Sequence, residues 1–84
     1  MKIVFWKKLE KDLKKAPNGR LIFKFNENIL ALKAGEEVKM KKLKWSKINF
    51  RIKILDYRLW LKIENWEILI ERFLHRKDIY KKYP

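Results

Sequence analysis

The sequence predicts an α+β fold in which an N-terminal strand and a helical hairpin pack on one face of an antiparallel β-sheet. The apolar residues recur at three- and four-residue steps between residues 6 and 33, which is the period of a helix. From residue 50 onward they recur at two-residue steps, which is the period of a strand. The expected order is strand, helix, helix and three strands, with a short strand at about 42–46 or a C-terminal helical turn as possible additions.

The front of the chain predicts one strand and two helices. Residues 2–6 are rich in β-branched and aromatic side chains, which is typical of a strand. From Trp6 to Ala16 the apolar residues fall on one face of a short helix, and Pro17-Asn18-Gly19 ends it. A second helix is expected from Arg20 to Lys33, with Gly35 as its C-terminal cap. Neither helix would be stable alone in water, so both need a sheet to pack on.

A first antiparallel hairpin is predicted from residues 50–54 and 57–63, in which apolar residues largely alternate with charged ones. Leu55-Asp56 is the expected two-residue turn, although it lacks the favoured Asn-Gly chemistry and a slightly longer loop is the alternative. A slip of one residue would place charges in the core, which favours the two-residue turn. The pairs expected on the face away from the helices are Lys53–Arg58 and Arg51–Trp60.

A second hairpin is predicted by the same reasoning, with its turn at Glu64-Asn65. This register pairs Leu61 with Ile68 on the core face. On the other face it places Glu71 opposite Arg58, where the carboxylate would partly neutralise the arginine.

The chain is short and strongly basic. Its 84 residues predict a single domain spanning 1–84, and its net charge of +13 favours polyanionic partners such as nucleic acid, an acidic protein or an anionic membrane surface. A solvated lysine-rich face is the alternative explanation. One stretch holds seven basic residues and no acid: Lys39, Lys41, Lys42, Lys44, Lys47, Arg51 and Lys53.

Several classes of protein are disfavoured. The chain has no cysteine and one histidine, which argues against disulfides and a structural zinc site. Its apolar runs are far shorter than the roughly 20 residues that span a bilayer, and its start does not resemble a secretory signal. We therefore expect a cytoplasmic domain without a metal, a small-molecule cofactor or a membrane partner.

One catalytic chemistry fits a basic face without a histidine pair or a metal. RNA is cleaved by its own 2′-hydroxyl when a base takes the hydroxyl proton, cations stabilise the phosphorane and an acid protonates the leaving oxygen. Crowding by two arginines disfavours the charged form of Lys53, which suits a base, whereas the lone His75 is more often structural. The residues alone do not decide between cleavage and passive binding. The candidates for catalysis are Lys53, Arg58, Arg76 and Tyr80, and those for RNA binding are Arg51, Lys44, Lys47, Trp60 and His75.

Two segments carry a family resemblance. FRIKILDYRL at 50–59 and HRKDIY at 75–80 resemble the basic strand, the YR strand and the closing motif of the RelE/ParE superfamily of type II toxins. The N-terminal helical pair is also similar to that family, so the resemblance covers nearly the whole chain.

The resemblance implies a toxin fold and one of two activities. The RelE-like branch cleaves mRNA in the ribosomal A site, and the ParE-like branch inhibits DNA gyrase. By motif position, Arg51 and Lys53 match the two basic residues before the turn, Arg58 matches the arginine of the YR strand, and Arg76 and Tyr80 match the closing motif. This set is similar to the RelE-like branch and implies an acidic antitoxin, the ribosome and mRNA as partners. A ParE-like gyrase inhibitor and an inactive binding module stay open as alternatives.

Overall fold

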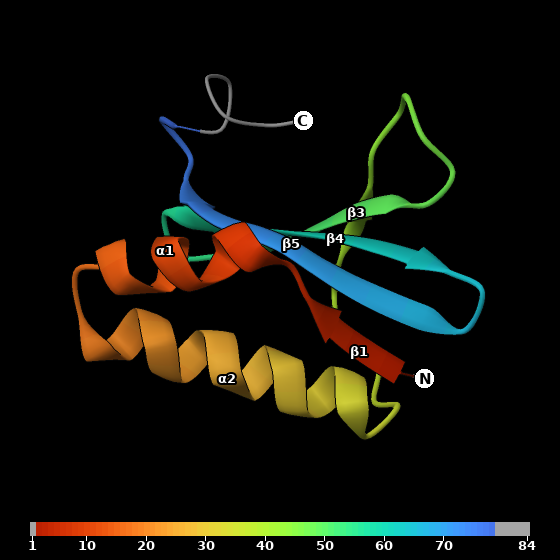
Figure 1. Ribbon diagram of the computed structural model, residues 1–84, viewed down its shortest axis with the longest axis horizontal. Helices are drawn as coiled ribbons and strands as arrows, with labels where there is room; N and C mark the ends of the chain where they lie inside the picture. Colours follow the sequence, from red (N-terminus) through yellow and green to blue (C-terminus); the bar gives the residue numbers. More distant parts are fainter. Residues whose placement is uncertain (1, 79–84) are drawn as a thin grey trace.

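The structure is a computed structural model that describes residues 2–78 (Figure 1). Tyr80, one of the expected catalytic residues, therefore lies outside the described residues. No helix within 2–78 is long and apolar enough to cross a membrane. The elements are β1 (Lys2–Phe5), α1 (Lys7–Lys15), α2 (Gly19–Lys33), β2 (Lys41–Lys42), β3 (Asn49–Ile54), β4 (Tyr57–Glu64) and β5 (Glu67–His75).

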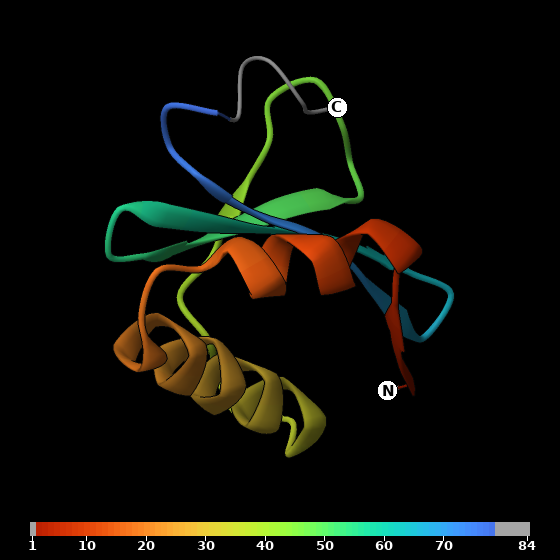
Figure 2. The same cartoon turned by 60° about the vertical axis from the view of Figure 1, so that its left-hand side comes forward.

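The strands form one five-stranded sheet in the order β1-β5-β4-β3-β2. Both helices lie on the same side of this sheet (Figures 1 and 2). The expected α+β class is confirmed, but the sheet is mixed, because β1 is an edge strand that runs parallel to β5 while the other neighbours are antiparallel. An apolar strand pattern is the same in both orientations, so the sequence did not reveal which strand β1 would pair with.

The helices begin and end close to where the sequence predicts. Asn18 caps α2, since its side-chain oxygen accepts a hydrogen bond from the Leu21 amide at 3.0 Å. Gly35 follows the end of α2 with a φ of 73°, the left-handed conformation that glycine adopts without strain.

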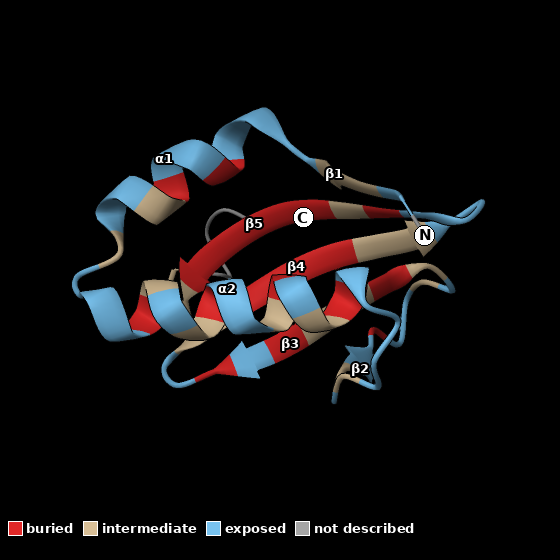
Figure 3. Cartoon of the chain, turned by 90° about the horizontal axis from the view of Figure 1, so that it is seen from below, coloured by how far each residue is buried: buried red, intermediate tan, exposed pale blue. Residues whose placement is uncertain are grey.

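The core lies between the helices and the sheet. The buried stripe of α2 packs over the central strands, and Figure 3 shows these strands buried along most of their length. A second, smaller cluster of Leu43, Trp60 and Leu74 lies apart from the main core. We call the sheet face opposite the helices the outer face. Strand alternation assigns Trp60 to it, because its neighbours Leu59 and Leu61 belong to the main core.

The register of the first hairpin is confirmed at every predicted pair. Lys53 lies opposite Arg58, and Arg51 lies opposite Trp60, with Leu55-Asp56 as the turn. The alternation of apolar and charged residues was decisive here, because any odd slip would have turned the charges toward the helices.

The predicted register of the second hairpin is wrong. The turn is Asn65-Trp66 rather than Glu64-Asn65, so Leu61 lies opposite Ile70 instead of Ile68. A shift of two residues leaves each side chain on its original face, so the apolar pattern could not detect it.

A bulge at the step between Trp60 and Leu61 shifts the register between β4 and β5 once more, for the residues that precede Leu61 on β4. Arg58 consequently lies opposite Leu74, not Glu71. The Glu71 carboxylate instead forms an ion pair with Lys62, at 3.6 Å between Nζ and Oε2. The expected neutralisation of Arg58 by Glu71 is therefore absent.

The Asn65-Trp66 turn is strained, and this leads to a stability prediction. Both residues have positive φ, 50° and 62°, as a type I′ turn requires, but a tryptophan is unfavourable there and its side chain is 82% exposed. We expect Trp66→Gly to raise the free energy of unfolding by about 1 kcal/mol in urea denaturation, because it removes strain and little packing. Trp66→Ala is the control, since alanine keeps a Cβ at positive φ. An equal gain in both variants would contradict the backbone explanation.

Candidate functional site

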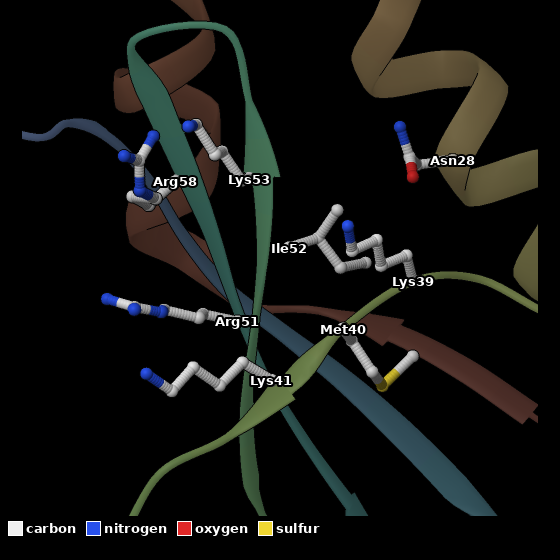
Figure 4. Close-up of a pocket in the computed structure, with 8 residues that line it drawn as sticks. All are labelled: Asn28, Lys39, Met40, Lys41, Arg51, Ile52, Lys53 and Arg58. Atoms are coloured by element: carbon white, nitrogen blue, oxygen red, sulfur yellow. The ribbon is translucent and has the colours of Figure 1, made fainter.

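A basic cleft with a volume of about 540 Å³ lies beside β3. Strands β3 and β4, the segment leading into β2, and Asn28 of α2 contribute to its walls (Figure 4). Among the residues that the structure describes, five cationic ones and no carboxylate line it: Lys39, Lys41, Arg51, Lys53 and Arg58. Such a cleft attracts anions, because positive charges gathered around a low-dielectric wall reinforce one another.

Strand geometry brings the cations together. Arg51 and Lys53 are two residues apart on β3, so they share a face. Arg58 is the neighbour of Lys53 across the hairpin, and Lys41 is the neighbour of Arg51 on the other side. Figure 4 shows the side chains of these residues extending from the same side of the strands.

Arg58 is held in place without being neutralised. Its Nη1 donates hydrogen bonds to the backbone carbonyls of Leu55 at 3.0 Å and Tyr57 at 2.9 Å, next to the β3–β4 turn. The Nε and Nη2 donors of the guanidinium remain for another acceptor. None of the ion pairs within residues 2–78 involves Arg51, Lys53 or Arg58. The guanidinium is thus oriented before any ligand arrives.

Arg76 lies at the same end of the hairpin as the Lys53–Arg58 pair. Its backbone amide donates to the Asp56 carbonyl at 2.8 Å, which fixes the chain after β5 beside the β3–β4 turn. The residue is exposed. The sequence therefore correctly grouped Arg51, Lys53 and Arg58. The backbone brings Arg76 beside the β3–β4 turn, although Arg76 does not itself line the cleft.

Trp60 is not placed as a base-stacking residue would be. Its side chain is only 6% exposed and packs with Leu43 and Leu74 under the chain that follows β2. This corrects the expectation of an RNA-binding tryptophan at this position. The alternation of β4 put Trp60 on the outer face as predicted, but Leu43 covers it.

His75 also lies away from the basic cleft. Its ring contacts Tyr57 edge-on, with 5.4 Å between the ring centroids, and Tyr57 packs against Phe73 of the main core. His75 Nδ1 accepts a hydrogen bond from the Lys77 amide at 3.1 Å. These contacts give His75 a structural role, and it does not line the basic cleft. Its contact with RNA stays a prediction.

Tyr57 is unsuitable as a base in the folded protein. Burial, with a smaller contribution from the charge of Asp78, raises the pKa of its phenol above the ordinary value of 10.0. The hydroxyl therefore stays protonated at neutral pH.

The two other expected RNA-binding residues lie on the chain between β2 and β3. Lys44 and Lys47 are exposed there, outside the residues that line the cleft. The sequence had included Lys39 and Lys41 in the basic run but had not singled them out as site residues. Lys39 and Lys41 reach the cleft because the chain before and within β2 runs beside β3. The spacing of apolar residues in the sequence does not reveal this path. Within 2–78 no group of acidic or histidine side chains is arranged to hold a metal ion.

The comparisons with known proteins agree with this architecture. The chain is 33% identical to Toxin RelE3 of Methanocaldococcus jannaschii in an alignment of 89 residues that covers 100% of both chains. This chain belongs to the RelE toxin family. No protein-family model matches it. The family resemblance inferred from FRIKILDYRL and HRKDIY is thereby confirmed.

Solved toxin structures share this fold. The RelB–RelE antitoxin–toxin complex from Methanococcus jannaschii superposes with a TM-score of 0.84 at 28% identity, covering 96% of this chain and 99% of that one. A copper-bound mutant toxin from Helicobacter pylori superposes with a TM-score of 0.69 at 20% identity, covering 94% and 98% of the two chains. The second similarity concerns the fold alone.

Proposed function

We propose that this RelE-family toxin is a ribosome-dependent mRNA endoribonuclease that inhibits translation. One observation carries the proposal: Arg51, Lys53 and Arg58 extend from the same side of the β3–β4 hairpin, in a cleft that no carboxylate of residues 2–78 lines. Uncompensated cations at one point of a sheet disfavour the folded state, and a phosphate group relieves their repulsion. A single phosphate within reach of several cations is also what phosphodiester cleavage requires.

The proposed reaction uses the 2′-hydroxyl of the RNA as the nucleophile. Lys53, in its neutral form, takes the hydroxyl proton as the oxygen attacks the adjacent phosphorus. Arg58 and Arg51 bind the non-bridging oxygens, whose negative charge increases in the transition state. The bond between phosphorus and the 5′-oxygen then breaks, leaving a 2′,3′-cyclic phosphate, and a proton donor protonates the leaving 5′-oxygen. Arg76 and Tyr80 are assigned to this leaving-group side, Tyr80 on the strength of the HRKDIY match alone.

The position of Lys53 supports its role as the base. It lies directly opposite Arg58, so its amine and the guanidinium can reach the same phosphodiester group. Lys53 is exposed, so an RNA strand can approach it.

We also propose that a cognate acidic antitoxin binds this chain. The structural relative from Methanococcus jannaschii is a toxin in complex with an antitoxin, and the net charge of +13 favours an acidic partner. An acidic chain would cover the basic cleft and compete with RNA for it.

RNA binding is expected to weaken steeply with salt. With five cations lining the cleft, a plot of log Kd against log salt concentration should rise with a slope of about 3 to 6 for single-stranded RNA, because each phosphate contact releases condensed counterions. Fluorescence anisotropy with a labelled oligonucleotide between 50 and 300 mM KCl (on the order of the range where such slopes are read) measures this slope. A flat plot would contradict the electrostatic basis of the interface.

Cleavage of ribosome-bound mRNA by the purified protein is the direct test of the proposed activity. Intact mRNA after incubation with programmed ribosomes, together with loss of supercoiling by purified DNA gyrase, would establish the ParE-like activity instead. Intact mRNA with unaffected gyrase would indicate a binding module without either activity.

A further inference from the structure

Trp45 is displayed to solvent in the middle of the most basic part of the chain. Its side chain is 61% exposed, on the loop of residues 43–48 that joins β2 to β3. We call this segment the β2–β3 loop. It rises above the outer face of the sheet, on the side away from both helices (Figures 1 and 2).

The β2–β3 loop is held by hydrogen bonds within it and to the neighbouring strands β3 and β4. Ser46 Oγ accepts from the amides of Ile48 at 3.2 Å and Asn49 at 3.3 Å, and it lies 2.6 Å from Asn49 Oδ1. The Leu43 amide donates to the Asn49 carbonyl at 2.9 Å, and the Ile48 carbonyl accepts from Ile63 of β4, also at 2.9 Å. The loop therefore presents its side chains from a defined backbone.

The exposure of Trp45 does not result from a lack of nearby apolar surface. Leu43, two residues earlier, packs against Trp60 and Leu74. The same turn thus buries a leucine and leaves the larger indole in water. Exposing this aromatic surface costs free energy in the unbound protein. A ring kept exposed on a fixed turn is suited to contact a partner.

The charges around Trp45 indicate the class of partner. Between residues 39 and 53 there is no acid, and Lys44 and Lys47 flank the indole along the chain. Lys41 is paired with Arg51, so the cations continue from the loop into the basic cleft. Trp45 is also the one large apolar side chain exposed between residues 39 and 53. The loop thus offers a single ring among lysines, not an apolar patch for a protein helix.

We propose that Trp45 stacks on an unpaired base of single-stranded RNA whose backbone runs along the lysines of the loop toward the basic cleft. An aromatic face paired with cations is the common device for binding single strands, since the ring contacts a base and the cations contact phosphates. This inference rests on the RNA-binding part of the proposed function and adds a base contact outside the cleft.

The test compares Trp45→Ala and Trp45→Phe for binding to a single-stranded RNA oligonucleotide and to an abasic strand of the same length. Trp45→Ala should weaken binding to the RNA roughly 5- to 150-fold, the usual range for loss of one stacking contact. Trp45→Phe should stay within a few-fold of the parent, because it keeps a ring. On the abasic strand all three proteins should bind alike.

Trp66→Ala is the matched control. Trp66 is also exposed, but it lies on the β4–β5 turn between Glu64 and Glu67, which repel a phosphate backbone. Its loss should leave RNA affinity unchanged.

Two results would overturn the stacking proposal. One is an unchanged affinity of Trp45→Ala for RNA. This result would count against stacking even if the variant bound an acidic protein more weakly. The other is an equal loss on RNA and on the abasic strand. Since the assay measures binding and not cleavage, an inactive toxin that shows the Trp45 effect would contradict the endoribonuclease proposal alone. A cleaving toxin without the Trp45 effect would contradict the stacking alone.

Discussion

Arg58→Ala is expected to slow cleavage of ribosome-bound mRNA about a hundred- to a thousandfold, or roughly 3–4 kcal/mol of transition-state stabilisation. The guanidinium is oriented by its bonds to the carbonyls of Leu55 and Tyr57, and its other donors are available for a phosphate. It would therefore bind more strongly as negative charge develops on the phosphoryl oxygens. The measurement is the single-turnover rate on programmed ribosomes.

The same substitution should leave the fold nearly unchanged. Arg58 lies opposite Lys53, so its removal relieves a repulsion between like charges. It also loses two hydrogen bonds to carbonyls near an exposed turn, and the two effects oppose one another. We expect the free energy of unfolding to change by less than about 1 kcal/mol. This separates a loss of activity from a loss of structure.

Two further variants sharpen this test. Arg58→Lys keeps the charge but not the planar fork, so an intermediate rate is expected. Lys33→Ala removes an exposed cation at the end of α2 on the opposite side of the sheet and should leave the rate unchanged. Full activity in Arg58→Ala would exclude the catalytic role. Loss of activity together with a collapsed melting temperature would make Arg58 a structural residue instead.

The first hairpin and its cations could be predicted because their positions depend on local alternation. Each strand of that hairpin has one apolar and one charged face, so only one turn position keeps all the charges out of the core. This register predicted that Arg51, Lys53 and Arg58 share the outer face.

The second hairpin could not be predicted in the same way, because its register depends on features without a sequence pattern. A tryptophan in a positive-φ turn position is rare, so Asn65-Trp66 was not recognised as the turn. The bulge at the step between Trp60 and Leu61 gives no local signal either. Because of the turn and the bulge, Glu71 forms its ion pair with Lys62 and does not lie opposite Arg58. The cleft is more positive than the sequence indicated for this reason.

The accessibility of individual site residues was also beyond sequence reasoning. Alternation placed Trp60 on the outer face, but whether a ring is exposed depends on which loop crosses it. The β2–β3 loop buries Trp60 beneath Leu43 and exposes Trp45 instead. The sequence had suggested an aromatic residue among the cations, and the structure changes which one is available.

A buried ion pair between α1 and β5 was not predicted, although one signal was present. The Asp12 carboxylate accepts hydrogen bonds from Arg72 Nε at 2.7 Å, Arg72 Nη2 at 2.9 Å and the Phe73 amide at 3.0 Å. Asp12 lies three residues after the buried Leu9, so it falls on the inward face of an otherwise lysine-rich helix. Its partner is 60 residues away and could not be identified from spacing.

Asp12→Ala is expected to lower the free energy of unfolding by about 3–5 kcal/mol, because it leaves the buried Arg72 guanidinium without its counterion. The two residues are only 4% and 9% exposed. Arg72 cannot escape this cost by losing its proton, because a guanidinium stays charged in proteins even without a counterion. In the native protein the hydrogen bonds to Asp12 raise the pKa of Arg72 further. Urea denaturation at neutral pH measures the effect, and in a domain of this size it is a large share of the total stability.

Glu10→Ala is the matched control for that prediction. Glu10 lies on the same helix in an ion pair with Lys14 at 3.5 Å, but both side chains are more than 70% exposed, 78% and 74%. Its loss should cost about 0.5 kcal/mol or less. The double variant Asp12→Leu with Arg72→Leu removes both charges, so it should recover most of the stability lost in Asp12→Ala. If Asp12→Ala were no more destabilising than Glu10→Ala, the pair would not be what fastens α1 to β5. If the double variant were as unstable as Asp12→Ala, the cost would come from the lost bond to the Phe73 amide rather than from an unpaired charge.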